Sequence, residues 1–578
     1  MILNLKNNSL IIFLIVLIAA LIFIPFIGNC PLFDWDEVNF AECAREMVVS
    51  GNYSRVQLNF RPFWEKPPFF IWLQAASMTI FGVNEFAARF PNAICSIVSL
   101  IAIYLIGKKF HSQKFGIIWS LIYAATLLPH LYFKSGLIDP WFNLFIFLSV
   151  FNSIQFLNNP NGKKEIYNSL LAGLFLGTAV LTKGPAAIVI VGLTLLVYSI
   201  WNRQLKLFLS KPFIIFAITT IIVSGSWFFI EWLKGNQDVI KEFIDYQIRL
   251  LKTEDSGHSG PFIYHFVVLL IGCFPASLIF IASYFNFRDL TPYQKQFRKM
   301  FISLFWVVIL LFSFAQTKIV HYSSLCYYPL TFIAALGLVQ NFERIKFNTA
   351  LKIIYWLVAV VFTLAFTIIA FINVLKPIII KSGIIKDEFA LLNLQADVNW
   401  TGFESLIALV FLIGAILIFV GINKHKIKLL YYGFFFNLIF IYLIISCIVP
   451  KIELYTQHAA IEFYKAVSKH DCHIETHGFK SYAYLFYSNR MPEDYSNKNQ
   501  IKITEELLHD WEKDGLSPLT SFPLANLYWM EHYEIEKPAY IIAKKQHEEE
   551  LSLNPELTKL YSKNGFSFFV RMPNNTAN

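Results

Sequence analysis

Residues 33–68 read FDWDEVNFAECAREMVVSGNYSRVQLNFRPFWEKPP and form the most highly charged stretch in the N-terminal part of the chain. This polar segment lies between an apolar run that ends near Gly28 and another that begins near Phe86. A chain this apolar has little reason to hold so many charges in one loop unless the loop has a function. The charged residues are Asp34, Asp36, Glu37, Glu42, Arg45, Glu46, Arg55, Arg61, Glu65 and Lys66.

The overall composition is that of a membrane protein. Of the 578 residues, 56% are hydrophobic, 17% are aromatic and only 15% are charged, whereas a soluble domain carries about 25% charged residues. Many apolar runs reach the roughly 17–25 residues that a membrane-spanning helix needs. Helices are expected because backbone groups in lipid must bond within their own segment. The sequence therefore predicts a polytopic α-helical membrane protein.

Thirteen apolar segments are predicted to span the membrane. They are residues 10–28, 86–107, 115–133, 137–157, 167–182, 186–201, 212–232, 262–285, 301–314, 322–339, 353–374, 405–422 and 429–449. The first segment is too long for the apolar part of a signal peptide, and no A-x-A cleavage site follows it, so we expect an uncleaved helix.

The distribution of Lys and Arg predicts the orientation. The net charge of +9 comes mostly from basic residues in short loops, which is a feature of membrane topology rather than of nucleic-acid binding. With a cytoplasmic N-terminus, the first loop (residues 30–85, called loop 1) and the C-terminal region both face the outer side. The cytoplasmic basic loops are then 108–114, 163–164, 203–211, 288–299, 344–346 and 424–428.

Two domains are expected. Residues 1–449 form the transmembrane domain, and residues 30–85 are its large outer loop. Within that loop, 37–49 has the spacing of an amphipathic helix, which we expect on the membrane surface. The stretch 69–82 is too short to span, so it predicts an interfacial or re-entrant helix.

The composition changes at Pro450, where mixed segments replace the long apolar runs. Residues 450–578 therefore predict a soluble periplasmic α/β domain. Its clearest expected elements are a helix at 459–468 and strands at 539–543 and 567–571. The acidic run Glu548-Glu549-Glu550 is interpreted as a solvated face.

Ionisable groups at the membrane edge gather on the outer side. Lysine ammonium groups there would attract a phosphate or pyrophosphate, and carboxylates would serve as a general base or hold a metal. The alternative is that the lysines only extend toward the interface and pair with the carboxylates. The set is Asp36, Glu37, Glu65, Lys66, Asp139, Lys183, His258, Lys318, His321 and Tyr322.

These motifs resemble a known family. WDEVNFAECAREM at 35–47, followed by FWEKPP at 63–68, is similar to the lipid-dependent membrane glycosyltransferases with the GT-C fold. The similarity is strongest to the 4-amino-4-deoxy-L-arabinose lipid A transferase branch, which is related to protein O-mannosyltransferases. Further matches are ARFPNA at 88–93, Asp139, LTKGP at 181–185, and Lys318 with Tyr322. The resemblance extends over about residues 10–450.

The resemblance implies a sugar donor linked to polyprenyl (undecaprenyl) phosphate and an inverting transfer at the periplasmic face of a bacterial inner membrane. The implied acceptor is lipid A or another envelope glycolipid, and no nucleic acid is involved. The implied catalytic residues are Asp36 and Glu65, and Glu65 with His258 would hold a divalent cation, the only cofactor considered. The implied substrate-binding residues are Lys66, Asp139, Lys183, Lys318, Tyr322, Arg45 and Glu37.

Two departures from the family pattern bear on the substrate. Asn39 stands where the family often has Arg, and Phe63 stands where it often has Tyr. A different sugar or acceptor is therefore expected more than a loss of activity. One alternative is an enzyme that acts on Ser/Thr of exported proteins. Another is a lipid or solute transporter, although the sequence lacks the repeated halves typical of transporters. For Arg45, packing against Glu42 or Glu46 is the alternative to substrate binding.

Overall fold

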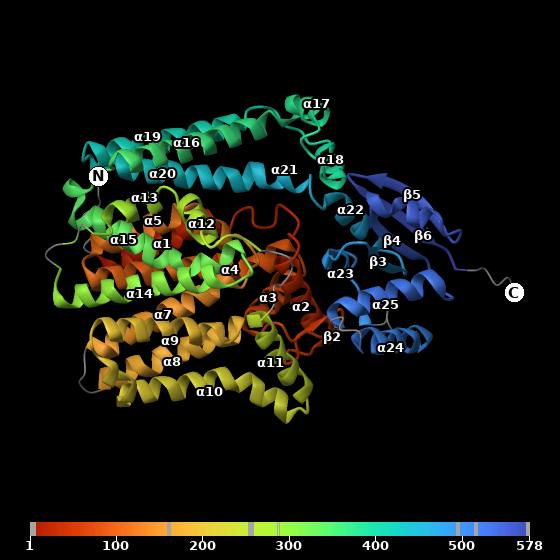
Figure 1. The fold of residues 1–578 in the computed structure, drawn as a ribbon, viewed down its shortest axis with the longest axis horizontal. Coiled ribbons are helices and arrows are strands. Elements are labelled where there is room, and N and C mark those ends of the chain that lie inside the picture. The colour runs from red at the N-terminus through yellow and green to blue at the C-terminus, as the bar shows by residue number, and fades with distance from the viewer. Residues whose placement is uncertain are drawn as a thin grey trace.

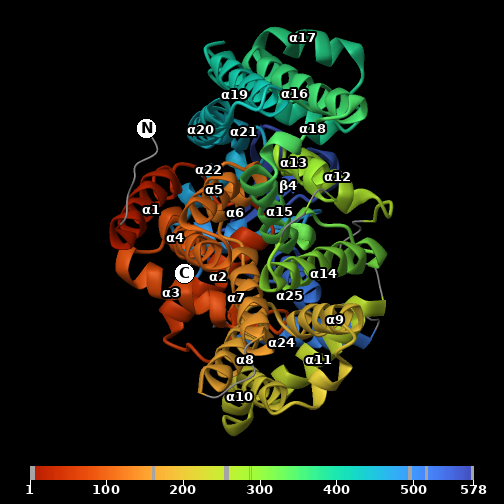
Figure 2. The same ribbon diagram turned by 90° about the vertical axis from the view of Figure 1, so that its left-hand side faces the viewer.

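The computed structural model of the protein describes residues 7–158, 163–252, 259–285, 287, 290–492, 498–513 and 518–573. A helical bundle occupies one side of the molecule and an α/β region the other, with helices α2 (Asp36–Ser50) and α3 (Phe69–Phe81) between them (Figure 1). The view along the bundle in Figure 2 shows α16, α17 and α19 at one edge and α10 at the opposite edge.

Each of the thirteen expected membrane segments has a helical counterpart. Nine helices in the described parts of the chain have the length and apolarity to cross a membrane, or up to eleven if two bent pairs count as single spans. The chain is thus a multi-pass membrane protein. The bounds are α1 (Asn8–Phe23), α4 (Glu85–Phe110), α5 (Gln113–Ala124), α6 (Leu127–Phe133), α7 (Asp139–Asn158), α8 (Lys163–Lys183), α9 (Ala186–Trp201), α10 (Lys211–Leu233), α12 (Tyr264–Gly272), α13 (Ala276–Ser283), α14 (Pro292–Phe314), α15 (Tyr327–Gln340), α16 (Thr349–Ala370), α19 (Ser405–Asn423) and α20 (Ile427–Leu443).

The two bent pairs mark where apolar runs fail to continue as one helix. α5 and α6 meet at 76°, and α12 and α13 meet at 110°. Pro275 precedes α13 and offers no N–H to the preceding turn, which explains a break at that point. The outer helices α10 and α16 expose large apolar side chains such as Ile221 and Leu357, as expected for surfaces that face lipid.

Loop 1 departs from one expectation. Helix α2 forms where predicted, but every residue from 37 to 47 is buried. The prediction that this helix lies on the membrane surface is therefore wrong. Its apolar side chains, such as Val38 and Ala41, share one hydrophobic cluster with Ile461, Tyr464 and other side chains of the α/β region. The α/β region thus covers the face that we had assigned to the membrane.

The α/β region is built around a four-stranded sheet of order β3-β4-β6-β5, in which only β3 and β4 are parallel. Helix α22 and strands β4 and β6 lie where the sequence predicted them. Strands β3 and β5 were missed because the first reads HIETH and the second exposes most of its residues at the sheet edge. The bounds are α22 (His458–Val467), β3 (His473–His477), α23 (Ala483–Tyr487), α24 (Lys498–Lys513), α25 (Pro518–His532), β4 (Ala539–Lys544), β5 (Leu557–Lys563) and β6 (Phe566–Arg571).

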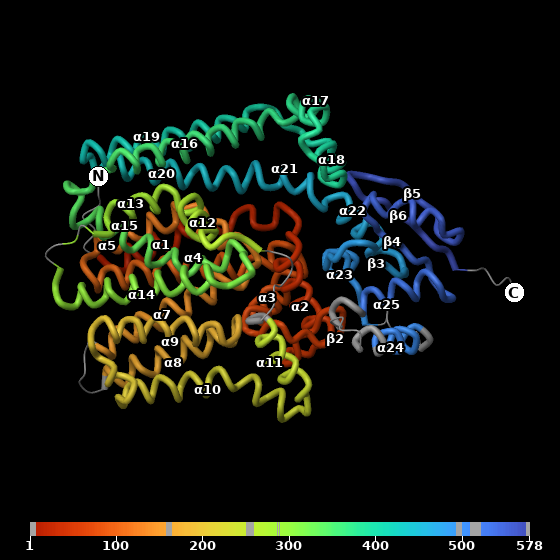
Figure 3. The backbone as a smooth tube through the Cα atoms, viewed as in Figure 1, coloured from red at the N-terminus to blue at the C-terminus, as the bar shows by residue number. Residues whose placement is uncertain are grey.

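Three further helices link the bundle to its surroundings. α11 (Gln237–Lys252) follows α10 and reaches loop 1 through an ion pair between Arg55 and Asp238. α17 (Ile372–Ser382) and α18 (Glu388–Leu394) extend from α16 toward the α/β region, and the backbone tube in Figure 3 shows this path. The ring of Phe389 in α18 packs edge-on against Phe566 at 5.1 Å.

Candidate functional site

Charged side chains from separate parts of the chain meet at the end of the bundle next to α2. Asp139 is the first residue of α7 and Lys183 the last residue of α8, so this helical hairpin brings them together. Lys183 Nζ lies 2.7 Å from Asp139 Oδ1. The Asp139 side chain is 4% exposed and that of Lys183 is 17% exposed, so the pair is largely shielded from solvent.

His321 connects this ion pair to loop 1. Its Nε2 lies 3.9 Å from Asp36 Oδ2, and it interacts electrostatically with Asp139, Lys183 and Lys66. His321 belongs to the 3-10 helix η2 (Val320–Cys326). The sequence analysis placed His321 at the outer edge but gave it no role. The structure puts it at the centre of the cluster.

Two tyrosines line the same cluster. The ring of Tyr322 lies 5.5 Å from Lys183 Nζ, a distance at which a cation–π contact forms. Tyr246 of α11 lies 5.2 Å from Lys66 Nζ, and its hydroxyl donates a hydrogen bond of 3.4 Å to Glu65. Sequence reasoning missed Tyr246 because it sits in a charged amphipathic helix with no motif.

Glu65 and Lys66 lie side by side at the cluster, with Lys66 Nζ 3.9 Å from Glu65 Oε2. Their side chains are 25% and 17% exposed. Asp36 is the most accessible acid of the cluster, with 42% of its side chain exposed. Asp36, Glu65, Lys66, Asp139, Lys183 and Tyr322 are therefore brought together, as the sequence analysis expected of residues that border one cavity.

Lys318 is placed differently from the prediction. Its ammonium group donates hydrogen bonds to the carbonyl oxygens of Phe312, Ser313 and Ala315, at 3.1, 2.7 and 2.5 Å. An ammonium group has three donors, and these carbonyls at the end of α14 have no helical partners. The Lys318 side chain therefore caps the C-terminal end of α14, and its three donors are used there rather than on the phosphate that the sequence had predicted.

The predicted substrate-binding roles of Glu37 and Arg45 are also contradicted by the structure. Arg45 is fully buried, with its guanidinium paired with Glu42 at 2.6 Å and bonded to the Arg490 carbonyl oxygen. Arg45 therefore packs against Glu42, which was the alternative to substrate binding in the sequence analysis. Glu37 is 4% exposed and forms a 2.7 Å ion pair with Arg89. These side chains have no surface left for a substrate.

Arg89 explains why Glu37 is buried. Its guanidinium also donates to the carbonyl oxygens of Ile27, Cys30 and Pro31, so it joins α4 to the chain just before loop 1. Burial alone would raise the pKa of Glu37, but the Arg89 charge and two backbone N–H donors hold that pKa below its ordinary value. His258, the other predicted metal ligand, lies outside the described residues.

Asn39 and Phe63, the two departures from the family pattern, are 7% and 1% exposed. Asn39 accepts a weak hydrogen bond from the Cys43 thiol within α2. Phe63 belongs to the hydrophobic cluster shared by loop 1 and the α/β region. Both side chains are therefore packed in the interior, and the expectation of a different sugar or acceptor stays a prediction.

Two cavities lie against loop 1, and their linings include no side chain of the charged cluster described above. One of about 510 Å³ is lined by Trp64, the neighbour of Glu65, together with Arg61, Tyr482 and Phe522. The other, of about 580 Å³, is lined by Trp35, the neighbour of Asp36, together with Phe389 and Lys544. Residues 479–481 line both cavities. The α/β region therefore forms a wall of both cavities, which loop 1 closes from the other side.

Asp34 joins loop 1 to that wall. Its Oδ1 accepts a hydrogen bond from the Tyr482 backbone N–H at 3.3 Å. Burial raises the pKa of Asp34 to about 6, and this rise is only partly offset by hydrogen bonds from Ser481 and Tyr482.

A multi-pass helical bundle carries the charged cluster at the end that loop 1 and the α/β region cover, and solved structures with this arrangement identify the fold as GT-C. The chain superimposes on ArnT from Cupriavidus metallidurans bound to undecaprenyl phosphate with a TM-score of 0.73, covering 98% of each chain at 14% identity. The apo form of that protein gives a TM-score of 0.71.

Sequence relatives agree with this fold. The chain is 28% identical over 369 residues to the undecaprenyl phosphate-alpha-4-amino-4-deoxy-L-arabinose arabinosyl transferase of Photorhabdus laumondii, covering 62% of this chain and 65% of that protein. The Shewanella sediminis protein of the same name is 26% identical and matches 55% of this chain and 58% of its own. The matches thus span less than two thirds of these relatives.

The dolichyl-phosphate-mannose-protein mannosyltransferase family model matches residues 65–228. The chain therefore resembles both the aminoarabinose transferases and the protein mannosyltransferases, as the loop 1 motifs indicated. The matched region begins at Glu65 and includes Asp139 and Lys183.

Proposed function

We propose that the protein is a bacterial inner-membrane glycosyltransferase that moves a sugar from a polyprenyl-phosphate donor to an acceptor at the periplasmic face. The observation that carries this proposal is the cluster in which two lysines, Lys66 and Lys183, lie beside the exposed carboxylate of Asp36. A phosphate-bearing lipid delivers its head group at this depth. Undecaprenyl phosphate appears in the names of the sequence relatives and as the bound molecule in a solved structure of the same fold, which supports a donor of this class.

In this proposal the ammonium groups of Lys66 and Lys183 bind the donor phosphate. Asp139 holds Lys183 in place and takes one of its three donors, which leaves two donors for phosphate oxygens. Fixed cations stabilise the charge that develops on the leaving polyprenyl phosphate. The Tyr322 ring packs against the Lys183 ammonium and limits where this group can move.

Asp36 is the proposed general base. The acceptor oxygen forms a bond to the anomeric carbon as Asp36 takes the acceptor's proton, and the carbon–oxygen bond to the phosphate breaks with its electron pair on the phosphate. A single displacement of this kind inverts the anomeric centre. His321 positions the Asp36 carboxylate. An acceptor that is itself a phosphate has no proton to lose, and Asp36 would then only orient it.

A divalent cation at Glu65 stays a prediction. The Glu65 carboxylate contacts the Lys66 ammonium and the Tyr246 hydroxyl, and the one metal-type group found among the described residues does not include it. A cation there would depend on His258. The steps above are therefore derived without it.

Lipid A or another envelope glycolipid is the first proposed acceptor, because the sequence relatives reported above are named as aminoarabinose transferases. The mannosyltransferase match over residues 65–228 favours Ser/Thr of exported proteins as the second candidate. Mass spectrometry of lipid A and of periplasmic glycoproteins from a deletion strain distinguishes the two. The missing modification identifies both the sugar and the acceptor.

The test of the reaction class uses purified full-length protein in detergent with a radiolabelled undecaprenyl-phosphate sugar and an envelope lipid extract. Covalent transfer of label to the extract is the expected result, since detergent leaves no compartments across which a transporter could act. A heat-denatured sample is the control. Binding of the donor without any covalent product, across both lipid and protein acceptors, would contradict the proposal.

A further inference from the structure

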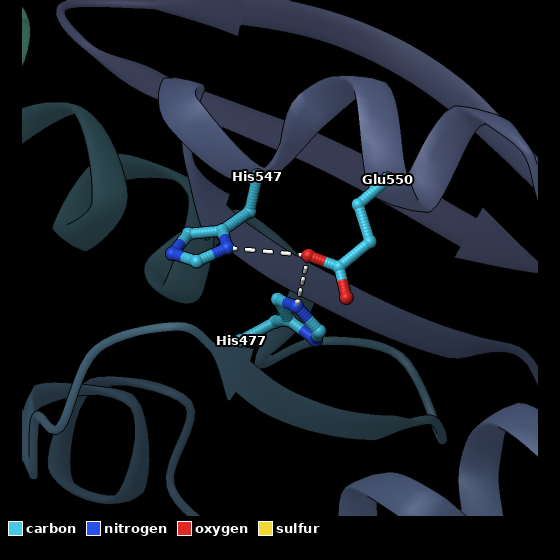
Figure 4. A group of neighbouring side chains, drawn as sticks. All are labelled: His477, His547 and Glu550. Carbon is cyan, nitrogen blue, oxygen red and sulfur yellow. Dashed lines mark hydrogen bonds and ion pairs between the residues drawn. The ribbon is translucent and has the colours of Figure 1, made fainter.

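A second cluster of ligand-type side chains lies in the α/β region, away from the charged cluster of the bundle. Glu550 Oε2 lies 3.3 Å from His547 Nδ1 and 3.6 Å from His477 Nε2, and Figure 4 shows both rings turned toward this carboxylate. One ligand atom from each residue falls within 4.8 Å of the others. The sequence analysis had interpreted Glu550 as part of a solvated acidic face.

The fold brings these residues together from distant parts of the chain. His477 is the last residue of β3, and it pairs with Ala543 of the parallel strand β4. His547 ends the short turn η6 (Lys545–His547) that follows β4, so both histidines emerge at the same sheet edge. Ligands in α/β folds bind outside the carboxyl ends of parallel strands. Glu550 lies three residues after His547, in α26 (Glu548–Ser552), and so faces the same side.

The spacing matches that of a bound Zn²⁺ ion. Zinc binds imidazole nitrogen and carboxylate oxygen at about 2.0–2.2 Å, which places neighbouring ligands of a tetrahedral site about 3.3–3.5 Å apart. The two distances to Glu550, 3.3 and 3.6 Å, are close to that edge length. Two imidazoles and a carboxylate also suit zinc better than calcium or magnesium, which prefer oxygen ligands.

Glu531 lies next to His477, with its Oε1 3.5 Å from Nδ1 of the imidazole. The two atoms form no hydrogen bond in this structure. In the proposed site the Nδ1 proton turns to this carboxylate, which leaves Nε2 as the metal-binding nitrogen. Gly478 completes the arrangement, because a Cβ at that position would lie 2.3 Å from the His547 ring. Its φ of +74° is also one that other residues rarely adopt.

We propose that His477, His547 and Glu550 hold a Zn²⁺-class divalent cation, with water at the fourth position. The cation ties the end of β3 to the turn after β4. Residues 478–481 follow His477 directly and line the 510 Å³ cavity beside loop 1. The metal therefore fixes the start of the segment that walls this cavity. The alternative is an ion pair of Glu550 with protonated histidines, which binds no metal.

The experiment measures zinc bound to the full-length, chelator-stripped protein in detergent, by titration with Zn²⁺ and by metal content after dialysis. The wild-type protein is expected to retain one equivalent more than His547→Gln or Glu550→Gln. Glu531→Gln is expected to keep the site with about 10–100-fold weaker affinity, as for other outer-shell partners. His532→Gln is the matched control, because His532 is an exposed histidine of the same region that lies outside the cluster.

The thermal midpoint of each metal-free variant separates loss of metal from loss of fold. We expect His547→Gln to match the wild type without zinc and to lack the rise in midpoint that zinc gives the wild type. Equal zinc content and equal zinc-dependent shifts in the wild type, His547→Gln and Glu550→Gln would overturn the proposal. The difference between variants isolates this site from any cation at Glu65.

Discussion

Asp36 and Glu37 are consecutive residues at the start of one helix, yet they face different environments. The Asp36 side chain is 42% exposed and lies near His321, whereas Glu37 is 4% exposed and is paired with Arg89. The same division runs through loop 1, where Glu65 and Lys66 face the cluster and Glu42 and Arg45 face the interior. One charged motif thus contains both the proposed site and the ion pairs that hold the loop in place.

The largest expected effect comes from breaking the buried set. Arg89→Met leaves Glu37 buried without its cation, and removal of one partner from a buried ion pair costs about 3–5 kcal/mol. We expect a large fall in thermal midpoint and in the yield of monodisperse protein. The double variant Glu37→Gln with Arg89→Met should recover part of the loss. A normal midpoint for Arg89→Met would show that the pair does not hold loop 1.

Substitutions among the exposed charged residues of the cluster should lower transfer activity rather than stability. Lys66→Met removes one proposed phosphate ligand, and a lost charged hydrogen bond of about 1.5–3 kcal/mol lowers transfer roughly 10–100-fold. The thermal midpoint should stay near that of the wild type, because Lys66 is only loosely paired with Glu65. Lys469→Met, at an exposed lysine of the α/β region, is the control. Unchanged transfer in Lys66→Met would remove Lys66 from the donor site.

Lys318 belongs by sequence to the predicted phosphate site but by structure to the residues that stabilise the fold. Lys318→Met leaves carbonyl groups at the end of α14 without their donors, at a cost of about 1–3 kcal/mol. Transfer per folded molecule should be retained, while the thermal midpoint falls. A variant with normal stability and greatly reduced transfer would return Lys318 to the phosphate site that the sequence predicted.

The smallest expected effect concerns pH. Because burial raises the pKa of Asp34 to about 6, the folded state favours the neutral carboxyl. Stability should therefore fall as the pH rises from about 4 to about 6, by about 2 kcal/mol. Asp34→Asn should remove most of the pH dependence of the thermal midpoint over this range. A wild-type midpoint that rises through the same range would contradict this reading of Asp34.

The sequence predicted the bundle well because apolar run length is a direct physical requirement of the membrane. It also placed Asp139 and Lys183 at the same membrane edge, since both lie at the ends of consecutive helices. It failed to separate Asp36 from Glu37, because the partner that buries Glu37 lies 52 residues further along the chain. The spacing of apolar residues in α2 predicts a buried face but does not show that the α/β region covers it.

The other misses have the same origin. Lys318 fits a family motif, but its hydrogen-bond partners depend on where α14 ends. Tyr246 reaches Glu65 only because α11 folds back against loop 1. The histidines at 477 and 547 are brought together by the parallel pairing of β3 and β4, which no local pattern indicates.

The most direct test of the account compares Asp36→Asn with Glu37→Gln in the same preparation, by transfer of labelled sugar and by thermal midpoint. A lost general base lowers the rate by about 100-fold or more, so Asp36→Asn should lose transfer with its midpoint unchanged. Glu37→Gln should lower the midpoint and keep its rate per folded molecule. Near-normal transfer by Asp36→Asn, with lost transfer in a stable Glu37→Gln, would contradict the account.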